Sequence, residues 1–100
     1  MIHVLWEFIV APEQRAAFEA AYKSNGVWVQ LFRRDPAYRE TLLLHDSKLP
    51  GRYVTVDVWE DGDSYAQFKN CFAAEYQKID QECEALTQSE RHIGTFERIS

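Results

Sequence analysis

The side chains that most often act as nucleophiles are few in this chain and lie far apart. The two cysteines, Cys71 and Cys83, fall in one predicted helix. Twelve residues of helix separate them by about 18 Å, whereas a disulfide needs Cα atoms within about 7 Å. They therefore cannot pair within one chain, which fits a reducing compartment.

The histidines give no pattern typical of a metal site. His3, His45 and His92 lie on three separate predicted strands. No CxxC, HExxH or other cluster of ligands accompanies them. We expect no bound metal, and we expect each histidine to be satisfied by its own neighbours.

Aromatic side chains are the distinctive feature of the composition. They make up 14% of the 100 residues, and three of them are tryptophan. This is more than a small core needs. One interpretation is a core built from large side chains; the other is an aromatic-lined pocket or a face that meets a second subunit.

Length and charge exclude several classes of protein. One hundred residues with a net charge of −5 predict a single domain over residues 1–100. No basic cluster is larger than Arg33-Arg34, so nucleic acid is not an expected partner. No apolar run approaches the roughly 20 residues of a membrane span, and the first residues lack the pattern of a signal peptide. We therefore expect a cytoplasmic protein with no membrane partner.

The periodicity of apolar residues predicts strands and helices in the order β-α-β-β-α-β. Ser64 is the predicted cap of the long second helix, with Gln67 completing a capping box. Gly94 in the last strand indicates a bulge or a close backbone approach. The predicted elements are a strand over 2–10, a helix from 11 that breaks at 24–26 and resumes over 27–34, strands over 38–46 and 52–60, a helix over 64–86 and a strand over 90–98.

This order is that of the ferredoxin-like α+β fold, a four-stranded antiparallel sheet with both helices on one face. In the strand over 52–60, Val54, Val56 and Val58 share one side, which we expect to meet the helices. The other sheet face then mixes apolar, aromatic and charged side chains, and we expect a second copy of the chain to cover it. The residues assigned to that open face are His3, Leu5, Glu7, Ile9, Arg39, Thr41, Leu43, His45, Tyr53, Thr55, Asp57 and Trp59.

Several short motifs resemble the antibiotic biosynthesis monooxygenase family of dimeric α+β barrels. Members of that family include quinone-forming monooxygenases that need no cofactor and haem-degrading enzymes. The resemblance implies a homodimer and, for this chain, no cofactor. The motifs are Trp6-Glu7-Phe8 before Ala11-Pro12-Glu13, the Pro50-Gly51-Arg52-Tyr53 turn, and Val58-Trp59-Glu60 followed by Ser64-Tyr65-Ala66-Gln67-Phe68.

The resemblance to quinone-forming members covers part of their pattern. Trp59 and Tyr65 match a tryptophan at the end of a strand and a tyrosine six residues later. Thr55 stands where those enzymes carry asparagine, and Ile79 stands near the place of an arginine.

The resemblance to haem-degrading members fails at every compared position. Those enzymes carry asparagine, tryptophan and a ligating histidine where this chain has Glu7, Phe68 and Tyr76. The helix over 64–86 contains no histidine. Haem degradation is therefore not expected.

Two functions follow as hypotheses. The first is cofactor-free oxygenation of a small phenolic or quinol-type aromatic. Under it, Tyr65, Tyr76 and Thr55 are candidates for hydrogen bonds to the substrate, and Glu7, Asp57 or a histidine for the base. The predicted pocket walls are Trp6, Tyr22, Trp28, Trp59, Phe68 and Phe72.

The second hypothesis is a dimer of the same fold that binds a small aromatic molecule or a protein without catalysis. The changes at Thr55 and Ile79 favour it, because they weaken the polar half of the family pattern. The alternative to a catalytic role for Glu7 and Asp57 is a buried hydrogen bond or ion pair between subunits, with Arg39 and His45 as partners.

Overall fold

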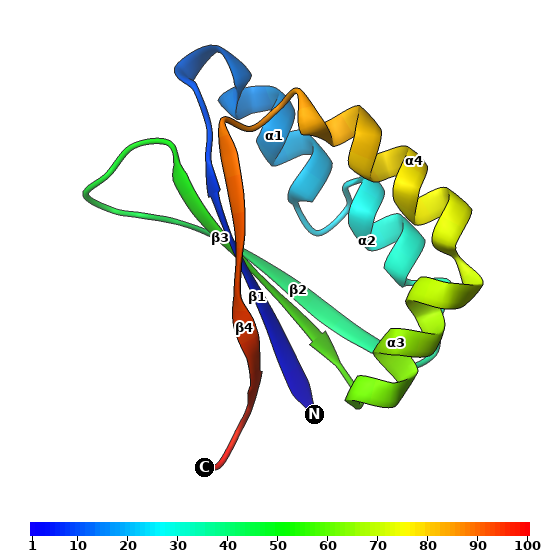
Figure 1. The fold of residues 1–100 in the computed structure, drawn as a ribbon. Coiled ribbons are helices and arrows are strands. Elements are labelled where there is room, and N and C mark those ends of the chain that lie inside the picture. Colours follow the sequence, from blue (N-terminus) through cyan, green and yellow to red (C-terminus); the bar gives the residue numbers. More distant parts are fainter.

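The structure is a computed structural model that describes residues 1–100 (Figure 1). Four strands and four α-helices follow one another, with a short 3₁₀-helix after the first strand. The elements are β1 (Ile2–Ile9), the 3₁₀-helix η1 (Pro12–Gln14), α1 (Arg15–Tyr22), α2 (Val27–Phe32), β2 (Tyr38–His45), β3 (Arg52–Trp59), α3 (Gly62–Cys71), α4 (Ala73–Glu84) and β4 (Ser89–Glu97).

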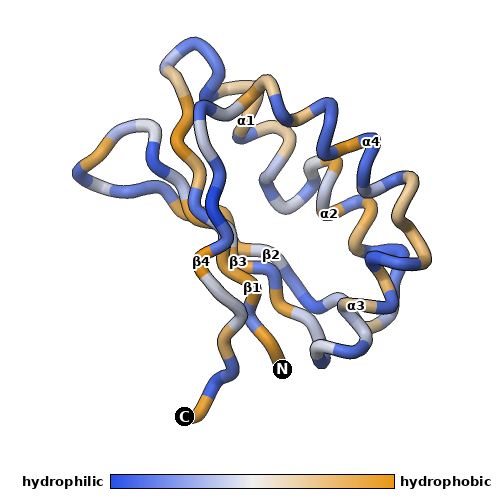
Figure 2. Tube along the Cα trace, in the orientation of Figure 1, coloured by the Kyte–Doolittle hydropathy of each residue, from blue (hydrophilic) through white to orange (hydrophobic).

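The strands form one antiparallel sheet in the order β2-β3-β1-β4. All helices lie on the same side of this sheet (Figure 1). The predicted α+β, ferredoxin-like fold is therefore confirmed. Hydrophobic and hydrophilic residues alternate along the strands and helices, as a two-layer arrangement requires (Figure 2).

The first helical segment is interrupted where the sequence predicts it. Gly26, which directly precedes α2, has extended backbone angles, with φ of −78° and ψ of 177°, so a left-handed conformation does not explain the glycine at this position. The requirement for glycine comes from packing instead. A Cβ atom at Gly26 would lie 2.3 Å from the carbonyl oxygen of Ala21, which is far inside van der Waals contact.

The second predicted helix differs from the structure at two points. It divides into α3 and α4 at Phe72, whose φ of −111° and ψ of 28° leave the helical region. It also begins earlier than predicted. Asp61, and not Ser64, is the N-cap, since its side chain accepts a 2.7 Å hydrogen bond from the Ser64 backbone N–H.

The irregularity predicted at Gly94 is confirmed. Leu5 of β1 pairs with Gly94 of β4, whereas the next residue, Trp6, pairs with His92. Ile93 is the extra residue of this bulge. The bulge changes which side chains of β4 face the helices beyond Trp6.

The two faces of β3 are the reverse of the prediction. Tyr53, Thr55 and Trp59 are buried beneath the helices, whereas Val54 and Val56 lie on the open face. Register explains the reversal: Thr55 pairs with Trp6, and Val4 with Asp57, and both β1 residues were correctly assigned to the helix side.

The same reversal holds in β2. Thr41 pairs with Asp57 and Leu43 with Thr55, so both face the helices. Leu42 and Leu44 occupy the open face and are 45% and 49% exposed.

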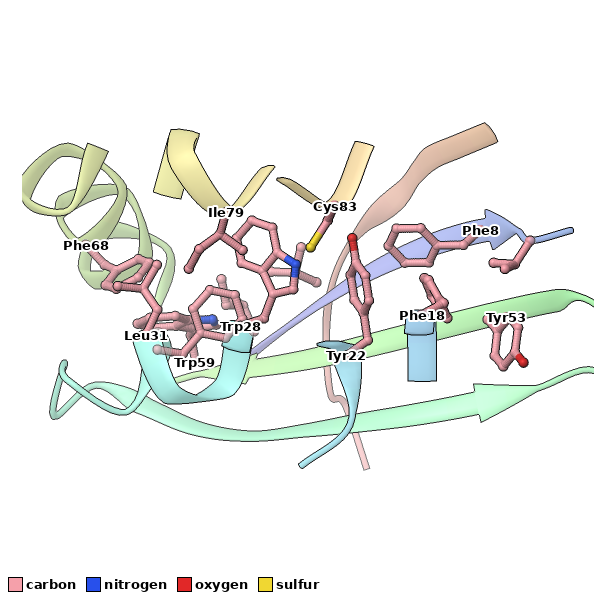
Figure 3. Close-up of a cluster of buried hydrophobic side chains, with 14 of the residues drawn as sticks. Phe8, Phe18, Tyr22, Trp28, Leu31, Tyr53, Trp59, Phe68, Ile79 and Cys83 are labelled. Atoms are coloured by element: carbon pink, nitrogen blue, oxygen red, sulfur yellow. The ribbon is translucent and has the colours of Figure 1, made fainter. Parts of the chain in front are cut away.

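The core lies between the sheet and the helices (Figure 3). Phe18, Trp59 and Phe68 have no exposed surface at all. Edge-on and tilted aromatic contacts connect them to their neighbours, including Trp59 to Phe68 at 4.8 Å between ring centroids. Much of the aromatic excess is therefore core, which leaves a smaller set of rings free to line a cavity.

Candidate functional site

A cavity of about 50 Å³ lies between the sheet and the helices. Every strand and every α-helix contributes at least one side chain to its wall. The wall is mainly aromatic, with a few oxygen-bearing groups. The lining residues are Trp6, Phe8, Tyr22, Trp28, Phe32, Thr41, Thr55, Asp57, Tyr65, Tyr76, Asp80 and Glu90.

Asp57 is the least exposed of the three carboxyl groups in the cavity wall. It stands on β3 two residues from Thr55, so both side chains point to the helix side. Burial raises the pKa of Asp57 from 3.8 to about 6, and a hydrogen bond from Thr41 opposes that shift in part. No lysine or arginine pairs with this carboxyl group.

A short hydrogen-bond chain holds Asp57 in place. The Thr41 hydroxyl donates to Asp57 Oδ1 at 2.7 Å. The Tyr38 hydroxyl lies 2.8 Å from the same threonine oxygen. Because Thr41 has one hydroxyl hydrogen and gives it to Asp57, Tyr38 must be the donor in that second bond. The other carboxylate oxygen, Oδ2, accepts no hydrogen bond from the protein.

Two tyrosine hydroxyl groups face this carboxyl group from the helix layer. Burial, the neighbouring Tyr76 and the charge of Asp57 raise the pKa of Tyr65. Burial and the charges of Asp80 and Asp57 raise the pKa of Tyr76 to about 12. Both phenols therefore stay protonated near neutral pH and are available as hydrogen-bond donors.

Packing fixes the rings that carry these hydroxyl groups. Tyr65, in the first turns of α3, lies 5.2 Å from Trp59 between ring centroids. Tyr76, on α4, meets Trp28 edge-on at 4.9 Å. The site thus combines one carboxyl group that can accept a proton with two donors that can hold an oxygen anion.

The structure brings together many of the residues that the sequence suggested. Thr55, Tyr65 and Tyr76 line the cavity. Trp6, Tyr22 and Trp28 form part of its wall.

Three other predicted wall residues do not line the cavity. Trp59 and Phe68 are fully enclosed in the core. Phe72, at the break between α3 and α4, is half-buried and packs against Phe68 at 5.1 Å.

Glu7 lies on the opposite face of the sheet from the cavity. Its carboxylate is held by Arg52 Nη2 at 2.6 Å and Arg91 Nη2 at 3.2 Å. These hydrogen bonds and charges lower the pKa of Glu7. Paired in this way and absent from the cavity wall, Glu7 is not positioned to act as the base. The partners suggested for it also differ, because Arg39 pairs with Glu60 at 3.2 Å.

The histidines do not converge. His92 packs against Trp6 at 5.1 Å between ring centroids, whereas His3 and His45 lie on β1 and β2. No group of three or more His, Cys, Asp and Glu side chains is placed to hold a metal ion. No helix has the length and apolar character needed to cross a membrane.

Sequence reasoning missed five residues of the cavity wall: Phe8, Phe32, Thr41, Asp80 and Glu90. Asp80 is exposed, as expected for the outer face of its helix, yet it lies one turn after Tyr76 and reaches the cavity rim. The spacing of four residues was the available signal. Glu90 could not be found in this way, because only the pairing of β4 with β1 places it opposite Phe8.

Comparison with known proteins agrees with this architecture. SnoaB, a cofactor-independent oxygenase from Streptomyces nogalater, is 20% identical in a variant form, with a TM-score of 0.77 over 99% of this chain and 93% of that one. A Nitrosomonas europaea protein bearing the description antibiotic biosynthesis monooxygenase is 17% identical, with a TM-score of 0.75 over the whole of both chains. A similar Bordetella bronchiseptica protein is 20% identical, with a TM-score of 0.77 over 99% and 97%. At these identities the likeness shows the fold.

Curated proteins include no match to this sequence. A family model for antibiotic biosynthesis monooxygenases matches residues 1–79, which is most of the chain and includes all the cavity residues except Asp80 and Glu90. The chain therefore belongs to the antibiotic biosynthesis monooxygenase family.

Proposed function

We propose that this protein is a cofactor-independent monooxygenase that acts on a small phenolic or quinol-type aromatic molecule in the cavity. One observation carries the proposal: Asp57 is a half-buried carboxyl group with no cationic partner, set in an aromatic-walled cavity beside two phenol donors. Family membership and the fold shared with a cofactor-independent oxygenase support the reaction class.

In the proposed reaction, the unbonded oxygen of Asp57 takes the proton of the substrate phenol. Tyr65 and Tyr76 stabilise the resulting phenolate by hydrogen bonding, and Thr55 offers one further donor. An electron-rich phenolate passes an electron to O₂, and the two radicals combine at a ring carbon. The O–O bond of the resulting peroxide then breaks: one oxygen atom stays as the new quinone carbonyl and the other leaves as water. That water takes up the two hydrogens the substrate loses, one from the phenol O–H and one from the ring C–H, so the four-electron oxidation of the substrate balances the four-electron reduction of O₂. The aromatic walls keep bulk water from the anion.

Oxygen uptake with a panel of hydroquinones and anthrones, in the presence of a chelator, tests the proposal. We expect uptake that depends on both substrate and protein. Asp57→Asn should lower kcat/KM by about 100-fold or more, because the base is lost. Tyr76→Phe and Thr55→Ala should also reduce it. Tyr53→Phe is the matched control, since Tyr53 is a buried tyrosine that binds Glu19 outside the cavity.

A binding protein without turnover is the second candidate. Two observations favour it: Thr55 and Ile79 depart from the polar pattern of quinone-forming relatives, and the cavity is small beside the 300–1,000 Å³ typical of ligand pockets. A ligand would have to move side chains in order to enter. Saturable binding of a phenol with no oxygen uptake, and equal affinity in Asp57→Asn, would establish this candidate instead.

We also propose that two copies of the chain associate through the open sheet face. That face carries half-buried Leu5 and Val56 at its centre and exposed Leu42, Leu44 and Phe96 around them. Exposed apolar side chains gathered on one face favour association between subunits.

The cytoplasm remains the proposed compartment. Cys71 is exposed and unpaired, and Cys83 is buried and unpaired. Free thiols of this kind are typical of a reducing environment.

A further inference from the structure

The charged side chains that line the cavity are all of one sign, although the Lys69 ammonium group packs on the ring of one wall residue, Tyr65, at 4.9 Å. The cavity wall contains three carboxyl groups, Asp57 inside and Asp80 and Glu90 toward solvent, and no lysine, arginine or histidine. Asp80 and Glu90 are both exposed, so they mark the mouth. Any charged ligand that enters passes these two groups before it reaches Asp57.

The arginines that form ion pairs are committed elsewhere. Arg34 pairs with Glu75, Arg39 with Glu60, Arg91 with Glu7, and Arg52 with both Glu7 and Asp46. None of these pairs includes a carboxyl group of the cavity. No ion pair within the protein therefore neutralises the cavity carboxyl groups.

The pKa values of two of the cavity carboxyl groups, Glu90 and Asp57, are raised in these surroundings. Although Glu90 as a whole is exposed, partial desolvation of its carboxyl group, together with the charges of Asp80 and Glu84, raises its pKa. Burial raises that of Asp57. A cation placed among these groups would relieve their repulsion, whereas an anion would add to it.

The aromatic walls of the cavity also favour a positively charged ligand. Trp6, Tyr22, Trp28 and Tyr76 present aromatic rings around the space, in addition to Tyr65, which already packs against Lys69. The negative face of an aromatic ring attracts ammonium groups, most strongly when water is excluded. The aromatic walls and the unpaired carboxyl groups thus both favour a positively charged ligand, by two independent effects.

We propose that the cavity selects aromatic molecules that carry a protonated amine and rejects aromatic carboxylates. The phenol end of the ligand lies inside, near Tyr65 and Tyr76, and the ammonium group lies at the mouth, where Asp80 and Glu90 accept its hydrogen bonds. This inference rests on the proposed function, because it takes the same cavity as the aromatic-binding site, and it names the class of substrate.

Three phenols of similar shape test the inference in the absence of oxygen, where no turnover occurs: tyramine, 4-ethylphenol and 3-(4-hydroxyphenyl)propionate. Binding to the intact protein is followed by NMR through the indole N–H signals of the three tryptophans. We expect tyramine to bind at least about tenfold more tightly than the propionate, with the neutral phenol between them.

A double variant at the mouth, Asp80→Asn with Glu90→Gln, should bring the affinities for tyramine and the propionate to within about threefold. Both residues are exposed, so the fold should survive their replacement. Glu82→Gln is the matched control, because Glu82 lies on α4 but lines a different groove, and it should keep the full preference.

Equal or tighter binding of the propionate overturns the inference, as does a preference that survives in the double variant. Failure of all three phenols to bind overturns it too. Since binding order is measured without oxygen, this result is separate from oxygen uptake. A charge preference without uptake would refute the monooxygenase proposal alone, and uptake without a preference would refute the inference alone.

Discussion

Two carboxyl groups on neighbouring strands show how environment decides the role of a residue. Glu7 and Asp57 lie on opposite faces of the same sheet. Two arginines lower the pKa of Glu7, whereas burial without a cation raises that of Asp57 to about 6. A carboxyl group that titrates close to neutral pH is suited to exchange protons with a substrate. A carboxyl group that is paired with two arginines, as Glu7 is, connects β1 to the neighbouring strands β3 and β4.

The first prediction concerns stability against pH. The pKa of Asp57 is raised from 3.8 to about 6 on folding, so the folded state binds this proton more tightly than the unfolded state does. The free energy of unfolding should therefore fall as pH rises from about 4 to 6, by roughly 3 kcal/mol. Asp57→Asn removes this contribution and should be more stable than the parent at about pH 8.

Urea unfolding of both proteins at several pH values checks this expectation. Subtraction of the variant curve from the parent curve cancels the titration of all other groups. A difference that does not vary with pH would show that Asp57 titrates alike in the folded and unfolded states.

At the scale of elements, the breaks in the helices decide which side chains reach the cavity. The break at Phe72 lets α3 and α4 run in different directions over the sheet (Figure 1). Tyr65 and Tyr76 thereby reach one cavity from two helices. The apolar spacing continues across the break, so periodicity alone predicted one helix. The break at Gly26 was predictable, since glycine marks it directly.

The second prediction compares two glycines at helix starts. Gly26→Ala should destabilise the protein by about 2 kcal/mol or more, because the new Cβ would lie 2.3 Å from the Ala21 carbonyl oxygen. Gly62→Ala is the matched control, since a Cβ there meets nothing within 4 Å. It should be neutral or stabilise the protein by up to about 1 kcal/mol. Thermal and urea unfolding measure both, and equal effects would contradict the packing explanation.

For the whole molecule, the sheet has one face that borders the cavity and one face that the helices leave open. Helices cover the first face. The second combines apolar side chains with the cluster formed by Glu7, Asp46, Arg52 and Arg91. Self-association through this face would leave the cavity, on the other side of the sheet, within each subunit.

The third prediction is that the protein sediments at twice its chain mass of 11.7 kDa. Leu42→Glu combined with Leu44→Glu should return it to a single chain, because four charges would be buried in the symmetric interface. Val27→Glu is the control, since Val27 is also exposed but lies on the helix layer. A parent that sediments as one chain, or a double variant that stays associated, would contradict the proposed interface.

Local patterns were sufficient for much of the fold. The order of elements, the face of β1 that carries Trp6, and the bulge at Gly94 were all predicted correctly. Several cavity residues were named as well. Tyr65 and Thr55 were named on the resemblance to a family, with Thr55 assigned to the wrong sheet face, and Tyr76 was named as an aromatic residue of the predicted helix. Ferredoxin-like topology follows from the order of elements because few arrangements accommodate it.

What the sequence by itself determined is the order of strands and helical segments, although not the break between α3 and α4, since helix and strand periods depend on residues close together in the chain. What only the tertiary structure decided is which side of β3 meets the helices. Both sides of that strand are suited to burial, one through three valines and the other through tyrosine and tryptophan. The choice is made by pairing with β1, about fifty residues away, which sets Thr55 opposite Trp6. That long-range register turns Asp57 into the cavity and, with it, the chemistry of the site.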